Sequence, residues 1–97
     1  MSTERLYIVA YDISSPKRWR RVFKLMKGQG EWLQLSVFQC RLSLKRRLEL
    51  QYALEAIINR QQDHVIILDL GDATKIKPSV SSLGKIFEAI KREPIIV

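Results

Sequence analysis

Cysteine is almost absent from this chain of 97 residues, in which Cys40 is the only one. An internal disulfide and a metal site built from several thiolates are therefore excluded. We expect Cys40 to be a small core residue rather than a nucleophile. The sequence also lacks a Walker A loop, the Cys and His spacing of a zinc site, a Ser-His-Asp set and the RNP1 run of an RNA-recognition motif. None of these common sites accounts for its function.

Long apolar runs are lacking too. No stretch approaches the ~20 residues that span a membrane, and the N-terminal segment MSTER has no apolar signal-peptide core. With 46% hydrophobic and 28% charged residues, the composition is typical of a folded, soluble domain. We expect one cytoplasmic domain over residues 1–97, with no membrane partner.

Acidic residues are scarce where basic residues are dense. Ten of the 17 basic residues lie between Lys17 and Arg47, where Glu31 is the only acidic residue, and the formal net charge is +7. This clustering is typical of proteins that bind nucleic acid. An anionic membrane or an acidic protein could also bind such a surface, but nucleic acid is our main hypothesis.

The first third of the chain predicts a strand followed by a helix. Leu6–Tyr11 is apolar without polar alternation, which indicates a strand buried on both faces. Asp12 ends this strand, Ser15 is placed to cap a helix that runs to Lys27, and Pro16 suits its first position. One helix face is apolar, through Trp19, Val22, Phe23 and Met26.

The opposite helix face carries cations alone: Lys17, Arg18, Arg20, Arg21, Lys24 and Lys27. Cations in the first turn oppose the helix dipole, and no Glu four residues away offsets their mutual repulsion. A face that only meets solvent usually mixes both signs of charge. We therefore favour an anion-binding face over a merely solvated one.

Residues 32–42 (WLQLSVFQCRL) form an extended segment whose apolar positions change parity. Leu35 and Val37 fall on one face, whereas the later apolar residues fall on the other. A regular strand cannot change parity without a bulge or a bend. We expect either one kinked strand or two short strands that meet near Phe38 and Gln39.

A second helix follows, over residues 44–59, with Ser43 placed to cap it. Cations again load its first turn. Its apolar stripe consists of Leu50, Leu54, Ile57 and Ile58, and is broadened by Leu48 and Tyr52.

Residues 65–68 predict another strand that is apolar on both faces and ends in a Gly turn at Asp69–Asp72. Two helices can cover only one face of a sheet, so the second apolar face needs other cover. Because two-fold homodimers are the commonest oligomers, we predict a homodimer. Three weaker elements are expected beyond the turn: a short strand at 80–83, helix-like spacing at 86–90 and an edge strand at 95–97.

Four motifs follow one another in an order that is typical of one family. They are Y-D-I-S at 11–14, K-R-x-x-R at 17–21, Q-L-S-V-F-Q at 34–39, and S-L-G-K at 82–85 before the terminal apolar strand. With them the chain resembles the small CRISPR-associated protein two family, the partner of the CRISPR adaptation integrase. Gln39 departs from the family pattern, because many members have Glu there.

The resemblance implies an α+β fold, a ferredoxin-like βαββαβ domain with an extra C-terminal strand. Two helices would lie on one face of an antiparallel sheet, and a homodimer would form through the other face. The resemblance also implies that the C-terminal segment, about 80–97, pairs with the partner protomer.

A metal site at Asp12 is implied as well, since Asp12 matches the family's carboxylate at the end of the first strand. That carboxylate is expected to face its counterpart in the dimer and to hold Mg²⁺ or Mn²⁺ between the two protomers. One Asp cannot complete a magnesium site, which needs two or more oxygen ligands, but a two-fold dimer supplies Asp12 twice. Alternatively, Asp12 only ends the strand and caps the Ser-Ser-Pro turn. Supporting candidates are Ser14, Ser36 and Phe38.

The basic residues are expected to contact the backbone of duplex nucleic acid, and such contacts carry no base identity and weaken with salt. The candidates are Lys17, Arg18, Arg20, Arg21, Arg41, Lys45, Arg46 and Arg47. Other residues are expected to have structural roles. Packing is expected of Trp19 and Trp32, and local hydrogen bonds are expected of His64, Asp69 and Asp72.

Two main functions follow from these residues and this resemblance. The first is a metal-dependent endonuclease that cleaves RNA or double-stranded DNA, with Asp12 as its catalytic metal ligand. The second is a non-catalytic scaffold for CRISPR adaptation, which binds duplex DNA and bridges subunits of CRISPR-associated protein one, the integrase. A basic nucleic-acid binder outside CRISPR biology is the third hypothesis.

Overall fold

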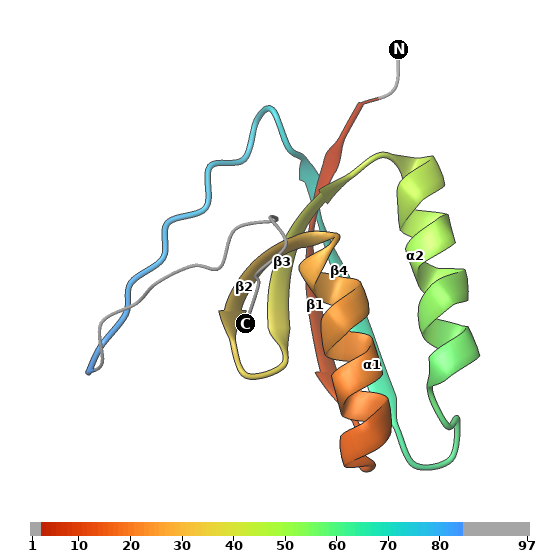
Figure 1. Cartoon of the computed structure of the whole chain (residues 1–97). Coiled ribbons are helices and arrows are strands. Elements are labelled where there is room, and N and C mark those ends of the chain that lie inside the picture. The colour runs from red at the N-terminus through yellow and green to blue at the C-terminus, as the bar shows by residue number, and fades with distance from the viewer. Residues whose placement is uncertain (1–2, 85–97) are drawn as a thin grey trace.

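Four strands and two helices alternate along residues 3–84, the part of the chain that the computed structural model describes (Figure 1). Local sequence explains both helix starts, because Ser15 Oγ accepts from Arg18 N at 3.3 Å and Ser43 Oγ accepts from Arg46 N at 3.2 Å. The elements are β1 (Arg5–Asp12), α1 (Pro16–Lys27), β2 (Gly30–Gln34), β3 (Val37–Leu42), α2 (Leu44–Ile57) and β4 (His64–Asp72).

The four strands form one antiparallel sheet in the order β2-β3-β1-β4. Both helices lie on the same face of this sheet, as Figure 1 shows. This βαββαβ arrangement confirms the predicted ferredoxin-like α+β fold. The predicted extra C-terminal strand at 95–97 and the helical spacing at 86–90 lie outside the described residues.

The core fills the space between the helices and the sheet. Alternate residues of β1, namely Tyr7, Val9 and Tyr11, point into it. Cys40 is completely buried there, which confirms its predicted role in packing. The other buried members are Ile13, Val22, Met26, Phe38, Leu42, Leu50 and Leu54.

The two strands of the segment 32–42 meet at Leu35 and Ser36, so the predicted position near Phe38 and Gln39 is wrong. Leu35 adopts a positive φ of 37° and is 75% exposed, while Trp32 Nε1 donates to its carbonyl oxygen at 2.9 Å. The apparent change of parity arises because Leu35 belongs to a hairpin turn rather than to a strand. Phe38 and Gln39 lie inside β3 and pair with β1.

The apolar stripe of α2 is narrower than predicted. Leu50 and Leu54 are buried, whereas Leu48 and Tyr52 are 42% and 73% exposed. The helix also ends at Ile57 instead of residue 59. Leu48 and Tyr52 lie on the side of α2 that the sheet does not reach, so they do not broaden the stripe.

The last strand is longer than predicted and does not end in a turn at Asp69. β4 continues to Asp72 because a β-bulge opposite Leu6 and Tyr7 absorbs one extra residue, with Gly71 at a φ of 113°. The strand predicted at 80–83 is also wrong, since these residues have no regular secondary structure.

The second face of the sheet, which we call the open face, is covered by neither helix, and the half of it formed by β1 and β4 is apolar. Ile8 and Ala10 of β1 pair there with Leu68 and Ile66 of β4. Ile66 and Leu68 are each 51% exposed. The two-sided apolar character predicted for both strands is therefore confirmed.

Candidate functional site

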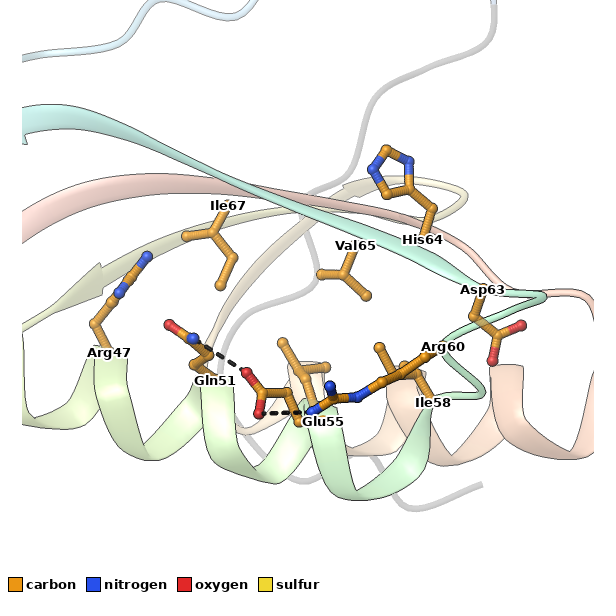
Figure 2. A pocket seen from close by; sticks show the side chains of 10 residues that line it. Arg47, Gln51, Glu55, Ile58, Arg60, Asp63, His64, Val65 and Ile67 are labelled. Atoms are coloured by element: carbon orange, nitrogen blue, oxygen red, sulfur yellow. Dashed lines mark hydrogen bonds and ion pairs between the residues drawn. The ribbon is translucent and has the colours of Figure 1, made fainter.

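Asp12 lies at the end of β1, where its Cα partner across the sheet is His64, the first residue of β4. Side chains of such a cross-strand pair share one face, with Cβ atoms about 4.5–5.5 Å apart. Both side chains are exposed, and together with Ala10, Tyr11 and Ile66 they line a hollow of about 190 Å³. Figure 2 shows the imidazole of His64 on the side of β4 that faces away from α2.

Neither side chain of this pair has a polar partner in the described part of the chain. Among residues 3–84, no hydrogen bond or ion pair involves the Asp12 carboxylate or the His64 imidazole. Within these residues, His64 therefore lacks the hydrogen bond that the sequence predicts, and Asp12 does not cap the Ser-Ser-Pro turn.

Asp63, the neighbour of His64, is in contrast fully engaged. Its completely buried carboxylate accepts from Arg18 Nε at 2.7 Å, from Ser14 N at 3.0 Å and from Asn59 N at 2.7 Å. The Arg18 guanidinium, helped by these backbone amides, holds the pKa of Asp63 well below its usual value. We call this group the Arg18–Asp63 clamp.

The clamp joins the loop after β1 to the loop before β4, and so fixes the backbone on either side of the Asp12–His64 pair. Ser14 Oγ strengthens the junction by donating to the carbonyl oxygen of Gln62 at 2.8 Å. Ser14 thus supports the site through the backbone. Arg18 also donates to Gln62 Oε1 at 3.1 Å, so its guanidinium forms several hydrogen bonds within the protein.

The predicted supporting residues Ser36 and Phe38 lie in the aromatic core rather than beside Asp12. Phe38 is completely buried, and Ser36 Oγ accepts from Trp19 Nε1 at 2.8 Å. Trp19 stacks on Phe23 with ring centroids 5.0 Å apart, and Trp32 meets Phe23 edge-on, which confirms their role in packing.

Tyr11 belongs to the same aromatic core, on the opposite side of β1 from Asp12. Burial raises the pKa of Tyr11 to about 12. Its hydroxyl is buried without a well-formed hydrogen bond among the described residues. The nearby Ser36 side chain lowers this pKa and so offsets part of the effect of burial.

The predicted nucleic-acid contacts do not form one surface. The helix layer carries exposed Lys17, Arg20 and Arg21 on α1, and the first turn of α2 lies near the other end of α1, where Arg46 and Leu25 line a common hollow. Figure 1 shows that the two helices run in opposite directions. Lys45 and Arg46 are exposed, and Arg47 is half-buried.

Arg41 is separated from these cations because it lies on the open face. Its neighbours in β3, Cys40 and Leu42, both point into the core, so the exposed Arg41 side chain points the other way. It lines a small hollow with Glu31 and Gln39.

A groove of about 380 Å³ separates α2 from β4, an edge strand of the sheet (Figure 2). Val65 and Ile67 point toward α2 across it, and Arg47 lines its far end. Glu55 accepts from Gln51 and pairs with Arg60, at 3.1 Å and 3.7 Å.

Asp69 and Asp72 have the local bonds that the sequence predicts. Asp69 forms an ion pair with Arg5 at 2.9 Å and accepts from Gly71 N, and Asp72 accepts from Thr74. These bonds lower the pKa of each carboxyl group. Neither Asp lies at the end of the sheet that carries Asp12.

The described residues of one protomer do not form a complete metal site, since no group of three or more His, Cys, Asp or Glu side chains among them could hold an ion. Asp12 and His64 bring one carboxylate and one imidazole to the same hollow. The sequence did not place His64 beside Asp12, because their proximity follows from the antiparallel pairing of β1 with β4, which brings the end of one strand to the start of the other.

Comparison with known proteins now identifies the family. Residues 5–77 match the family model described as CRISPR associated protein Cas2. The chain belongs to the Cas2 family. This confirms the resemblance that the sequence motifs indicate.

Members of the Cas2 family from two bacteria are similar over nearly the whole chain. A CRISPR-associated endoribonuclease Cas2 of Geobacter sulfurreducens is 56% identical over 94 residues, covering 97% of this chain and 99% of that protein. One from Rhodospirillum rubrum, named CRISPR-associated endoribonuclease Cas2 1, is 54% identical over 96 residues, covering 99% of this chain and 94% of that protein.

A solved structure has the same fold. The crystal structure of hypothetical protein TT1823 from Thermus thermophilus superposes with a TM-score of 0.73 at 32% identity, covering 88% of this chain and 99% of that one. Within residues 3–84, neither helix is long and apolar enough to cross a membrane.

Proposed function

We propose that this Cas2-family protein is a homodimeric, metal-dependent endonuclease that serves CRISPR adaptation and hydrolyses phosphodiester bonds in RNA or duplex DNA. The observation that carries the proposal is the Asp12 carboxylate at the end of the open face, which is exposed and has no polar partner among residues 3–84. Its similar relatives are named endoribonucleases, which favours RNA as a substrate.

Dimerisation through the open face is supported by its exposed apolar side chains. Ile66 and Leu68 leave about half of their surface in solvent, and Ile8 and Ala10 lie beside them. A second protomer would remove this apolar surface from water, which stabilises association by about 25 cal/mol per Å² of apolar area before the costs of binding. The C-terminal segment 80–97 remains predicted to pair with the partner's sheet.

A two-fold dimer across this face would bring Asp12 of each protomer toward a common site. Carboxylate oxygens suit Mg²⁺ and Mn²⁺, and this role fits the Asp12 carboxylate, which no polar group of the described residues contacts. Such a metal, when bound, neutralises phosphate charge and activates a water molecule. The chain's own contribution is to hold the carboxylates in place through the Arg18–Asp63 clamp and to bind the phosphodiester backbone through exposed cations of α1 and α2.

A non-catalytic role is the second candidate. Exposed cations on α1 and α2 can bind duplex DNA whether or not it is cleaved, since contacts with the phosphate backbone depend only on charge. In this form the dimer would hold duplex DNA and bridge subunits of CRISPR-associated protein one, the integrase, in a cytoplasmic complex.

Cleavage of labelled RNA and duplex DNA by the wild type and by Asp12→Asn distinguishes the two candidates. Asn keeps the shape of Asp but loses the charge, so cleavage should require Mg²⁺ or Mn²⁺, stop with EDTA and fall by about 100-fold or more in the variant. Nucleic-acid binding should survive. Glu49→Gln, which neutralises an exposed carboxylate on α2, should cleave as the wild type does. Equal cleavage by Asp12→Asn and the wild type would leave only the scaffold.

A further inference from the structure

We infer that His64 is a second metal ligand beside Asp12, so that the site takes a transition-metal ion such as Mn²⁺ in preference to Mg²⁺. This inference rests on the proposed dimeric site, because one protomer supplies only two of the donors. It adds an imidazole from each protomer to a site that otherwise contains carboxylates alone.

Backbone register places the two donors together. Asp12 and His64 are Cα partners in the β1–β4 ladder, so their side chains project from the same face of the sheet. Val65 and Ile67 point toward α2 in Figure 2, whereas His64 projects from the other side of β4. Both donors line the same hollow of about 190 Å³.

Other donors near this end of the sheet are already occupied. The carboxylate of Asp63 accepts from Arg18, Ser14 and Asn59, and its side chain is completely buried, so it cannot reach an ion on the open face. The imidazole of His64 and the carboxylate of Asp12 have no such partners among residues 3–84. The clamp therefore fixes the backbone and leaves these two side chains as the free ligands.

Ligand chemistry decides which ion suits the pair. Mg²⁺ prefers oxygen ligands and water, whereas divalent ions of the first transition row also take imidazole nitrogen, with affinities that rise from Mn²⁺ through Co²⁺ to Cu²⁺. Two protomers would provide two carboxylates, which suit Mn²⁺ as they suit Mg²⁺, and two imidazoles, which add affinity for Mn²⁺ over Mg²⁺. Substrate phosphate and water would complete the coordination.

Metal binding can be measured without any assay of cleavage. His64 is the only histidine of the chain, so in untagged protein its ring protons give the only imidazole NMR signals. One equivalent of diamagnetic Zn²⁺ per dimer, an ion that binds imidazole well, should shift these signals in the wild type through direct coordination. Paramagnetic Mn²⁺ is not used here because it broadens every nearby proton, coordinated or not. Unshifted His64 signals in the presence of bound Zn²⁺ would overturn the inference, and this measurement needs no variant.

Calorimetric titration with Mn²⁺ and with Mg²⁺ provides the second measurement. His64→Ala should weaken Mn²⁺ binding by at least about 10- to 100-fold, the range known even for outer-shell partners of metal ligands, while Mg²⁺ binding changes little. Gln61→Ala, an exposed side chain in the same loop, is the matched control and should bind both ions as the wild type does.

The outcomes separate this inference from the proposed function. If Asp12→Asn abolishes Mn²⁺ binding and His64→Ala does not change it, the Asp12 site stands and the role of His64 fails. If neither substitution changes Mn²⁺ binding, or the wild type binds no Mn²⁺, both the inference and the proposed metal site fail. Circular dichroism and sedimentation of each variant confirm that it is folded and has the oligomeric state of the wild type.

Discussion

At the scale of single residues, the aspartates fall into two classes. Asp63, Asp69 and Asp72 accept hydrogen bonds within the protein, and these bonds lower the pKa of each. Asp12 is exposed and has no such bond among the described residues. This division explains why Asp12 alone of the four aspartates is available to an external cation within the described part of the chain, and why the other three serve structure.

Acid should weaken the folded state through Asp63. Because its folded pKa lies below the unfolded value of 3.8, its contribution to stability is present above that pH and is lost as the pH falls toward the lowered folded pKa. Asp63→Asn should therefore lower stability at pH 7 and flatten the fall in stability between pH 5 and pH 2. Urea unfolding at a series of pH values measures both effects.

The matched variant for this prediction is Arg18→Ala, which removes the cation that lowers the pKa of Asp63. Arg18→Ala should reduce the fall in stability between pH 5 and pH 2 in the same way, because this fall reflects the ion pair rather than one residue. If the stability of both variants fell between pH 5 and pH 2 as steeply as that of the wild type, the clamp would not govern acid unfolding.

At the scale of elements, local chemistry predicts helix starts well and strand ends poorly. Ser15, Pro16 and Ser43 occupy the predicted capping positions, since a cap depends on neighbours within one turn. The hairpin turn escaped prediction because Leu35 adopts a positive φ, although such turns usually contain Gly or Asn. The end of β4 was not predicted correctly because its bulge depends on pairing with β1, which is far away in the sequence.

The corrected stripe of α2 makes a direct prediction about stability. Leu54 is 2% exposed, so Leu54→Ala should cost about 2–5 kcal/mol of unfolding free energy through lost burial and a cavity. Leu48→Ala makes the same chemical change at an exposed position of the same helix and should stay within ~0.5 kcal/mol. Denaturant unfolding of both variants tests this, and equal losses would mean that the stripe is as broad as the sequence suggests.

At this scale, the sequence predicts one of the two residues of the candidate site and not the other. Asp12 follows from its position after a strand and from the family resemblance, but His64 requires the sheet order as well. Ser14 was correctly placed near the site, yet its role is to join two loops. Phe38 lies in the core because it points inward from β3, and the Ser36 hydroxyl accepts from Trp19 while its carbonyl oxygen accepts from Tyr11 N.

At the scale of the whole molecule, the protein has two unlike faces. The helix layer is rich in exposed cations, and the half of the open face formed by β1 and β4 is apolar with Asp12 and His64 at one end. This division suits a dimer that joins its sheets and directs its helices outward. The sequence predicts such a dimer because β1 and β4 are apolar on both sides while both helices cover one side only.

The central claim is that each active site needs Asp12 from both protomers, and mixing subunits tests it most directly. Wild type and Asp12→Asn are unfolded together, refolded in varied ratios and assayed for cleavage at constant total protein. The account predicts that an equal mixture falls to about a quarter of wild-type activity, since only that share of random dimers has two Asp12 side chains. Activity that instead falls in proportion to the wild-type fraction would contradict the shared site.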